Sequence, residues 1–490
     1  MTERLQKART YEREEEVKIP KDTRPVFHVT PRVGWQNDPN GFSIYQGEYH
    51  LFYQYNPYDT HWGPMYWGHY KTKDFIRWEP CPCAMAPDTP YDCDGGCFSG
   101  TALEYEGKHV LMYTGVADKV QEDGTTLSLQ NQCIAVGDGT DYEKVAHNPV
   151  ITGEMLPEGT SVVDFRDPKI WKDEDRFLVL AATRDKNGSG QLALFSSDDL
   201  EQWKFEKMLM SSEGKYGDIW ECPDFFELDG KQVLILSPIF SNAKGLEIHN
   251  GHNCLYFVGD FDREKLEYTH DEGSQIDYGM DFYAPQTVES SDGRRILIGW
   301  VQNWSNYMVP EEMKWAGMMT IPRELTLCGG KLIQRPVREL ERYRKGRVDW
   351  EGVVDTSRGE VHPAGLSGRC IDMTVKLEGE DYESFTIWVA CNEEYRTALT
   401  YDRKKGIFTT DRSCSGMGKD MLCNRSMYVE APENRLDIRI LMDRFSVEIF
   451  VLGGAKAMTS LIFTPLCAEE IRFSCEGEVQ IFVEKYNIVI

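Results

Sequence analysis

Five copies of one short pattern most constrain how this 490-residue chain can fold. Each copy is a turn residue followed by a run of large apolar residues. The copies lie at 47–54, 107–114, 175–182, 230–237 and 293–300. Successive copies start roughly 55 to 70 residues apart, a length that suits one four-stranded sheet with its loops. The spacing predicts a five-bladed β-propeller, with a long β-sandwich as the competing interpretation.

The pattern changes near residue 340. A charged segment at 338–346 is followed by short alternating strands at 370–376, 384–390, 435–441 and 446–451, which are typical of an antiparallel β-sandwich. Residues 3–15 are expected to form a short helix. We therefore expect an all-β protein made of an N-terminal extension (1–27), a five-bladed β-propeller (28–336), a linker (337–350) and a β-sandwich (351–490).

Composition restricts the class of partner. The formal net charge of −26 argues against nucleic acid and anionic membranes, and no apolar run is long enough to cross a bilayer. The charged first twenty residues do not resemble a secretory signal, and the fourteen scattered cysteines suit reduced thiols. We expect a cytoplasmic protein with a small-molecule partner and without metal or cofactor, either a monomer or a homodimer.

Acidic residues precede three of the five repeats. Asp38, Asp167 and Glu221 each lie roughly seven to ten residues before a repeat's turn, so we expect them in matching register on innermost strands. Such strands surround the axis of a propeller, where three buried acids would repel one another unless chemistry needs them. Residues 38–41, Asp-Pro-Asn-Gly, also fit the four positions of a type I turn, which we expect to hold Asp38.

Aromatic, amide, hydroxyl and guanidinium groups accompany the acids. Aromatic faces and hydrogen-bonding groups suit a polyhydroxylated ring, whereas Trp67 and Trp78 are expected to pack between blades. Paired acids around such a ring indicate glycoside hydrolysis. The candidates for sugar contacts are Trp35, Asn37, Gln54, Trp62, Phe98, Ser99, Arg166 and Tyr283.

Four short boxes occur in order along the chain: Asn-Asp-Pro-Asn (37–40), Phe-Ser-Gly (98–100), Arg-Asp-Pro (166–168) and Glu-Cys-Pro (221–223). Through them the chain resembles glycoside hydrolase family 32, the invertase and fructanase family. Residues 277–286, 300–304 and 315–325 extend the likeness, and 442–450 resemble the appended sandwich of the family. The likeness covers nearly the whole chain from His28 onward. Gln36 departs from the family pattern, in which an aliphatic residue or Met is more usual.

The resemblance implies a retaining β-fructofuranosidase. Asp38 would be the nucleophile, Glu221 the acid and base, and Asp167 the stabiliser of the transition state, with Trp304 added to the sugar contacts. Retention would place the two reacting carboxyl groups about 5–5.5 Å apart. The same scaffold would serve a fructosyltransferase. A non-catalytic sugar-binding propeller and an arabinosidase-like enzyme are more distant alternatives.

Sucrose, sucrose 6-phosphate and short fructo-oligosaccharides are all candidate substrates. A phosphorylated sugar would need a basic contact at the outer rim, for which Lys244 and Lys314 are candidates. The sandwich could be structural, support a dimer, or add a residue to the rim.

Overall fold

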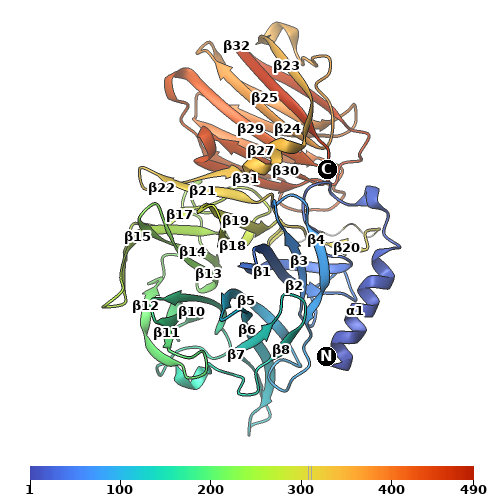
Figure 1. Cartoon of the computed structure of the whole chain (residues 1–490). Coiled ribbons are helices and arrows are strands. Elements are labelled where there is room, and N and C mark those ends of the chain that lie inside the picture. Colours follow the sequence, from blue (N-terminus) through green and yellow to red (C-terminus); the bar gives the residue numbers. More distant parts are fainter. Residues whose placement is uncertain (307, 309, 311) are drawn as a thin grey trace.

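The structure, a computed structural model, describes residues 1–306, 308, 310 and 312–490. A ring of five small sheets is stacked against a larger C-terminal sheet, coloured orange to red in Figure 1. Helix α1 (Glu3–Glu16) lies outside the ring. The expected five-bladed propeller followed by a sandwich-like domain is confirmed. Within the described residues, none of the helices combines the length and the apolar surface that a membrane span requires.

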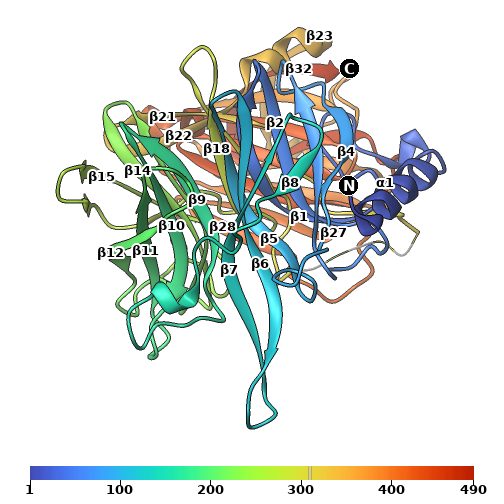
Figure 2. The same cartoon turned by 60° about the horizontal axis from the view of Figure 1, so that its bottom comes forward.

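Each blade is an antiparallel sheet whose strands follow one another in chain order. Blade 1 contains β1 (Gly34–Tyr45), β2 (Glu48–Asn56), β3 (Tyr66–Thr72) and β4 (Glu79–Met85); blade 2 contains β5 (Gly96–Tyr105), β6 (Lys108–Val120), β7 (Thr126–Gly137) and β8 (Tyr142–Lys144); blade 3 contains β9 (Arg166–Asp173), β10 (Arg176–Arg184), β11 (Gly190–Ser197) and β12 (Lys204–Ser211). Blade 4 contains β13 (Ile219–Leu228), β14 (Lys231–Ile239), β15 (Leu255–Asp262) and β16 (Glu267–His270), with β17 (Ser274–Gln275) on β15; blade 5 contains β18 (Tyr283–Glu289), β19 (Arg295–Trp300), β21 (Arg323–Cys328) and β22 (Lys331–Pro336). The five sequence repeats form the second strands, β2, β6, β10, β14 and β19. The β6–β7 hairpin projects from the ring (Figure 2).

The first strand of each blade surrounds the axis, since β1, β5, β9, β13 and β18 contact one another in ring order. Every one of them carries a β-bulge against its second strand. The extra residues lie at 37–38, 99, 167–168, 222–223 and 284–285. A bulge bends a strand and redirects its side chains, so these five bulges determine what faces the axis.

The expected type I turn at 38–41 is wrong. These residues lie within β1, which has a second bulge between Asn40 and Ser43. Gly41 adopts φ 51° there, and a Cβ at this position would lie 2.7 Å from the Phe52 ring. Proline is tolerated at position 39 because the innermost strand is an edge strand along most of its length. Turn-forming residues therefore serve a bulged strand.

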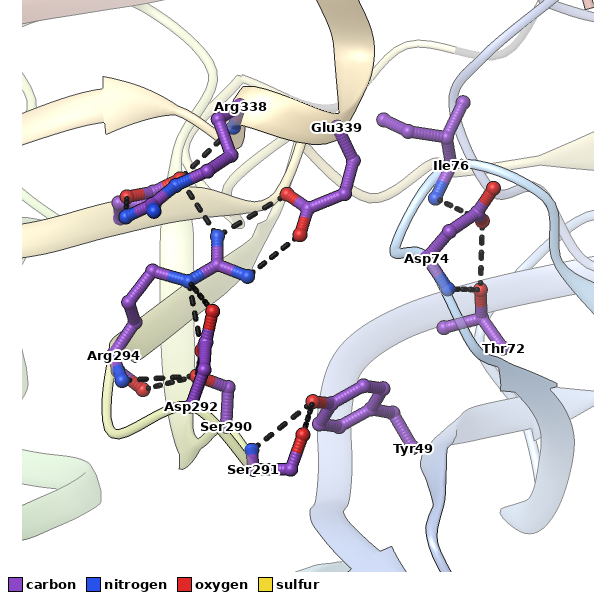
Figure 3. A network of polar contacts seen from close by, with 11 residues as sticks. Tyr49, Thr72, Asp74, Ile76, Ser290, Ser291, Asp292, Arg294, Arg338 and Glu339 are labelled. Carbon is purple, nitrogen blue, oxygen red and sulfur yellow. Dashed lines mark hydrogen bonds and ion pairs between the residues drawn. The ribbon is translucent and has the colours of Figure 1, made fainter. Parts of the chain in front are cut away.

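The ring closes between blades 5 and 1. Strand β20 (Trp315–Ala316) pairs in parallel with the start of β1. Further out, the Tyr49 hydroxyl lies 3.1 Å from both the Oγ and the backbone N of Ser291 (Figure 3). Arg294 forms ion pairs with Asp292 at 2.8 Å and with Glu339 at 2.6 Å, which ties blade 5 to the segment that follows it.

Helix α1 covers the outer edge of blade 1. Arg9 Nε donates to the carbonyl of Cys83 at 2.8 Å, and Glu12 Oε1 accepts from the Cys83 N–H at 2.9 Å. The N–H and the C=O of Cys83, on the edge strand β4, thus bond to side chains in place of the main chain of a neighbouring strand. Leu5 and Ala8 bury the apolar side of the helix. The extension therefore protects an edge that could otherwise pair with another chain.

The C-terminal sheet has ten strands and folds on itself through its longest one, β32 (Glu470–Ile488). The first part of β32 pairs with β25, and its last part pairs with β24 and β23, so the two halves enclose a common apolar core. Strand β23 starts at Arg344, inside the segment assigned to the linker from sequence, after the short 3₁₀ helix η3 (Arg338–Tyr343). The strands are β23 (Arg344–Asp355), β24 (Ile371–Glu378), β25 (Tyr382–Cys391), β26 (Arg396–Asp402), β27 (Ile407–Cys414), β28 (Asn424–Tyr428), β29 (Arg435–Asp443), β30 (Ser446–Val451), β31 (Lys456–Leu461) and β32; the remaining 3₁₀ turns are η1 (Lys21–Thr23), η2 (Gly153–Met155), η4 (Thr356–Arg358), η5 (Pro432–Asn434) and η6 (Leu452–Gly454).

A buried ionic network joins the two parts of the molecule. His28 lies between two acids of the C-terminal sheet, with Nδ1 2.9 Å from Asp443 and Nε2 2.9 Å from Glu448. Arg323 of blade 5 bonds the other oxygen of Glu448 at 2.6 Å and Asp277 at 3.0 Å. All five side chains are excluded from solvent. Burial alone would lower the pKa of His28, but the hydrogen bonds and charges of its two acids raise it to about 9.

The stability of this joint should depend on pH through His28. Because the pKa is 6.5 for the unfolded chain and about 9 for the folded one, the contribution is fully present below pH 6.5 and is lost as pH rises through 9. We expect wild-type protein to lose about 3 kcal/mol of unfolding free energy across that window through this group. In His28→Gln, stability should be lower at pH 6.5 and this alkaline decline should be smaller, as measured by urea denaturation.

His61→Gln, at an exposed histidine of blade 1, is the matched control and should keep the wild-type dependence of stability on pH. An unchanged alkaline decline in His28→Gln would contradict the assignment.

Candidate active site

The three predicted acids meet at the axis, but not in the matching register that we expected. Each lies on the innermost strand at its bulge. Glu221 directly precedes the bulge of β13, Asp167 is the first bulge residue of β9, and Asp38 is the second bulge residue of β1. The three therefore occupy successive positions. They are close enough that the charge of Glu221 raises the pKa of both Asp38 and Asp167.

Asp38 is held by one oxygen only. Its Oδ2 accepts a hydrogen bond from Ser99 at 2.7 Å and lies 3.5 Å from the thiol of Cys222. Its Oδ1 has no hydrogen-bond partner among the residues that the structure describes. Burial, followed by the nearby charge of Glu221, raises the pKa of Asp38 to about 6, while the hydrogen bonds from Ser99 and Cys222 oppose the rise.

Asp167 is fixed by its strained backbone and by main-chain donors. Its φ of 61° lies in the left-handed region, which an aspartate tolerates better than most residues. Its N–H donates to Thr114 Oγ1 at 3.0 Å, and its Oδ2 accepts from the N–H of Cys222 at 2.9 Å. Burial and the charge of Glu221 raise the pKa of Asp167, and Arg166 opposes them.

Glu221 has a partner on each carboxylate oxygen. Arg166 Nε donates to Oε1 at 2.9 Å, and the hydroxyl of Tyr283 lies 2.8 Å from Oε2. Arg166 is itself held by Gln130 at 3.2 Å and by Asp164 at 3.4 Å. The carboxyl group of Glu221 is thus oriented from two neighbouring blades, and its negative form is stabilised by a full positive charge.

Cys222 also belongs to the site, although the sequence marked it only as the middle residue of the Glu-Cys-Pro box. Its thiol lies 3.5 Å from Asp38 Oδ2 and 3.5 Å from Asp167 Oδ2, between the two acids. Burial and the surrounding carboxylates raise the pKa of this thiol well above its ordinary value, so it remains protonated and can donate. A neutral donor thereby separates two like charges.

The remaining predicted residues lie at three places. Trp35 Nε1 donates to Asn37 Oδ1 at 2.8 Å, and the rings of Trp35 and Trp304 stack with centroids 6.1 Å apart, which builds one wall beside Asp38. Gln54 is buried on β2 and donates to the carbonyl of Cys97, between blades 1 and 2. Phe98 and Trp62 meet edge to face at 6.0 Å, and Trp62 is 47% exposed, as a residue of the rim would be.

Gln36 does not change the sugar site, although its identity departs from the family pattern. Its side chain is fully buried and its Nε2 lies 3.4 Å from the carbonyl of Val29, in the segment that leads into the propeller. Trp67 is likewise fully buried and donates to the carbonyl of Phe98, which fits the expected packing between blades.

His252 was not predicted, because no motif surrounds it. It lies in the loop between β14 and β15, with its ring 5.3 Å from that of Tyr283 and its Nδ1 2.5 Å from Ser305 Oγ. It therefore stands beside the tyrosine that contacts Glu221. Gln130 was missed for the same reason, since it lies on the third strand of blade 2. Within the described ranges, no three His, Cys, Asp or Glu side chains are grouped to hold a metal ion.

The geometry supplies the parts of a two-carboxyl reaction. One buried carboxyl group has an oxygen without a hydrogen-bond partner in the described residues, a second is oriented by a cation and a hydroxyl, and a third accepts from a main-chain N–H. Two acids in unlike surroundings are what general acid and nucleophilic roles require.

Comparison with known proteins agrees with this geometry. Residues 28–336 match the family model described as the glycosyl hydrolases family 32 N-terminal domain, and residues 339–489 match the family 32 C-terminal model. Sucrose-6-phosphate hydrolase of Zymomonas mobilis is 37% identical over 90% of this chain and 86% of its own. Raffinose invertase of Escherichia coli is 32% identical over 90% of this chain and 89% of its own.

A solved structure gives the same result. The β-fructofuranosidase of Bombyx mori is 32% identical and superposes with a TM-score of 0.84 over 99% of this chain and 98% of its own, and a variant of that enzyme has been solved in complex with sucrose. The chain therefore belongs to glycosyl hydrolase family 32 and is a glycoside hydrolase of the β-fructofuranosidase type.

Proposed function

We propose that this enzyme hydrolyses terminal β-D-fructofuranosyl residues with retention of configuration, through a covalent fructosyl-enzyme. The observation that carries the proposal is the asymmetry of Asp38. Its Oδ2 is tied to Ser99, whereas its Oδ1 has no hydrogen-bond partner in the described part of the chain. A carboxylate that is oriented through one oxygen and free at the other is suited to nucleophilic attack.

In the first step, Asp38 Oδ1 forms a bond to the anomeric C2 of the fructosyl unit while the bond from C2 to the leaving oxygen breaks. Glu221 gives its proton to that oxygen, so the leaving sugar departs as a neutral alcohol. Glu221 is then negative, and the contacts from Arg166 and Tyr283 stabilise this charge. Asp167 would accept hydrogen bonds from ring hydroxyls and stabilise the positive charge that develops at C2.

In the second step, water loses a proton to Glu221 and attacks C2, and Asp38 leaves as a carboxylate. Fructose is released and both acids return to their starting states. A fructosyltransferase would share the first step and differ only in the acceptor. The ratio of free fructose to oligosaccharide products at high sucrose concentration separates the two, and we expect free fructose to dominate.

The substrates that we propose are sucrose, sucrose 6-phosphate and short fructo-oligosaccharides. Support comes from the names of the relatives, which denote fructosides both with and without a phosphate. We also propose that the enzyme works in the cytoplasm, since its fourteen cysteines are all free thiols. A comparison of kcat/KM for sucrose, sucrose 6-phosphate, kestose and inulin should rank the small substrates above the polymer.

Removal of the nucleophile tests the mechanism. Asp38→Ala should lower kcat on sucrose by at least about 10⁴-fold, because no other group can form the covalent intermediate. The fold should persist, since burial disfavours the charged form of this acid and its loss removes no ion pair. Activity is measured by release of free fructose, and folding by thermal denaturation.

Asp198→Ala, at an exposed aspartate of blade 3, is the control and should behave as wild type. Turnover in Asp38→Ala within tenfold of that of wild type would refute the assigned role.

The hydrogen bond from Ser99 predicts a shift in the pH profile. Asp38 must be ionised to react, so activity should fall as pH drops through about 6. Because the Ser99 hydroxyl lowers the pKa of Asp38, Ser99→Ala should move the acidic limb of kcat/KM to higher pH, by up to about one unit.

Ser43 lies on β1, the strand of Asp38, but is bonded to His109. Ser43→Ala should therefore leave the acidic limb of kcat/KM in place. A lower rate with an unmoved acidic limb in Ser99→Ala would show that Ser99 does not set the ionisation of Asp38.

A further inference from the structure

Arg425 is a half-buried arginine without a partner. It lies on β28, an edge strand of the C-terminal sheet. Among the residues that the structure describes, none forms a hydrogen bond or an ion pair with its side chain, and its Nε is shielded from solvent. A buried charge is costly unless it is paired. An unpaired guanidinium in a chain with net charge −26 therefore needs an explanation.

The orientation of Arg425 follows from its strand pairing. It stands opposite Thr410 of β27, and directly opposed residues project from the same face of a sheet. Thr410 is fully buried, as is Arg412 two residues further on. Phe408 and Met427 of the same face pack in the core of the C-terminal sheet. Arg412 forms an ion pair with Asp281 of the propeller at 2.5 Å, so the end of this face at which Arg412 lies meets the propeller.

Asp281, the acid that Arg412 contacts, already has partners on both of its oxygens. One oxygen of Asp281 is taken by Arg412 and by the N–H of Leu461, and the other accepts from Asn306. The charge of Asp281 acts on Arg425, but the two side chains form no hydrogen bond or ion pair. Two arginines therefore share one acid, and the second is left with a positive charge to satisfy.

A second polar group without a partner faces the same region. His249, in the loop between β14 and β15, is buried and its Nε2 has no hydrogen-bond partner in the described residues. The loop reaches β28, since a Cβ on Gly245 would lie 3.9 Å from the hydroxyl of Tyr428. Burial and the charge of Arg425 lower the pKa of His249 to about 4. Asn253 fixes the loop by bonding both the N–H and the carbonyl of His249.

The same loop reaches the reacting groups. His252 lies three residues after His249, so their Cα atoms are at most about 11 Å apart. The ring of His252 packs against Tyr283, which contacts Glu221. His252 also bonds Ser305, and the next residue, Asn306, bonds Asp281, so the loop connects the acid beside Arg425 to the tyrosine beside Glu221.

We propose that Arg425, with His249 beside it, binds the phosphate of a phosphorylated leaving sugar, so that a fructoside carrying a phosphate monoester on its leaving hexose is the preferred substrate. This inference rests on the function proposed above and specifies its substrate class. The planar guanidinium group can donate to two phosphate oxygens at once, and a phosphate dianion supplies the negative partner that Arg425 lacks. Neutral sucrose offers only hydroxyl groups.

The lysines predicted from sequence are weaker candidates. Lys244 is exposed and lies 3.7 Å from Glu272. Lys314 is exposed in a groove beside α1, together with Tyr11 and Glu15. Neither presents a desolvated, unsatisfied charge. The side chain that best fits the requirement comes from the C-terminal sheet, more than one hundred residues away from either lysine in the sequence.

Kinetics on two substrates test the proposal. Arg425→Met keeps the length and the apolar contacts of the side chain but removes the charge. It should lower kcat/KM for sucrose 6-phosphate by at least tenfold, mainly through KM, and change kcat/KM for sucrose by less than twofold. Arg435→Ala, at an exposed arginine of β29, the strand that follows β28 in the sequence, is the control and should alter neither value.

The outcomes separate the two proposals. Equal losses on both substrates, or no loss on either, would overturn the role of Arg425. A wild-type enzyme that cleaves neither fructoside would instead overturn the proposed function.

Inorganic phosphate provides a measurement that does not depend on turnover. It should raise the melting temperature of wild type and inhibit sucrose hydrolysis competitively, and both effects should be lost in Arg425→Met. If phosphate acts through Arg425 without competing with sucrose, the site binds a separate anion and the assignment to the substrate is wrong.

Discussion

A bulge in the innermost strand of every blade determines what this propeller can hold at its axis. A regular strand alternates its side chains between two faces, which would turn every second residue away from the centre. The extra residues at 37–38, 99, 167–168, 222–223 and 284–285 interrupt that alternation in all five blades. Three of the bulges begin with a non-glycine residue in the left-handed region, Asp167, Cys222 and Ala284. Backbone strain of this kind persists where the surrounding structure fixes it and where function uses it.

These bulges bring three acidic side chains together at the axis of the propeller. Burial raises the pKa of both Asp38 and Asp167, and the charge of Glu221 raises both further. The protein opposes this with donors of graded strength: a hydroxyl and a thiol on Asp38, a main-chain N–H on Asp167, and a guanidinium on Glu221. Identical side-chain chemistry thereby acquires different roles, because the surroundings of each acid differ.

The sequence allowed the architecture and the three acids to be predicted because both depend on local patterns. Repeats identify blades, and boxes next to them identify innermost strands. The turn at 38–41 was predicted wrongly because Asp, Pro, Asn and Gly also suit a bulged edge strand. Matching register failed because each acid takes a different place relative to the bulge of its own strand, and no residue pattern marks that place. Gln130, His252 and Arg425 carry no local signal, since their importance arises from contacts between blades or between the two parts of the chain.

The central claim is that Asp38 attacks the sugar directly and that a covalent fructosyl-enzyme separates two displacements. The anomeric form of the first product records this directly, because two successive inversions at C2 restore the original configuration. Time-resolved NMR of sucrose hydrolysis, sampled before mutarotation, should show β-fructofuranose as the initial product. Initial release of α-fructofuranose would mean that water attacks in a single displacement, and would contradict the role of Asp38 as nucleophile.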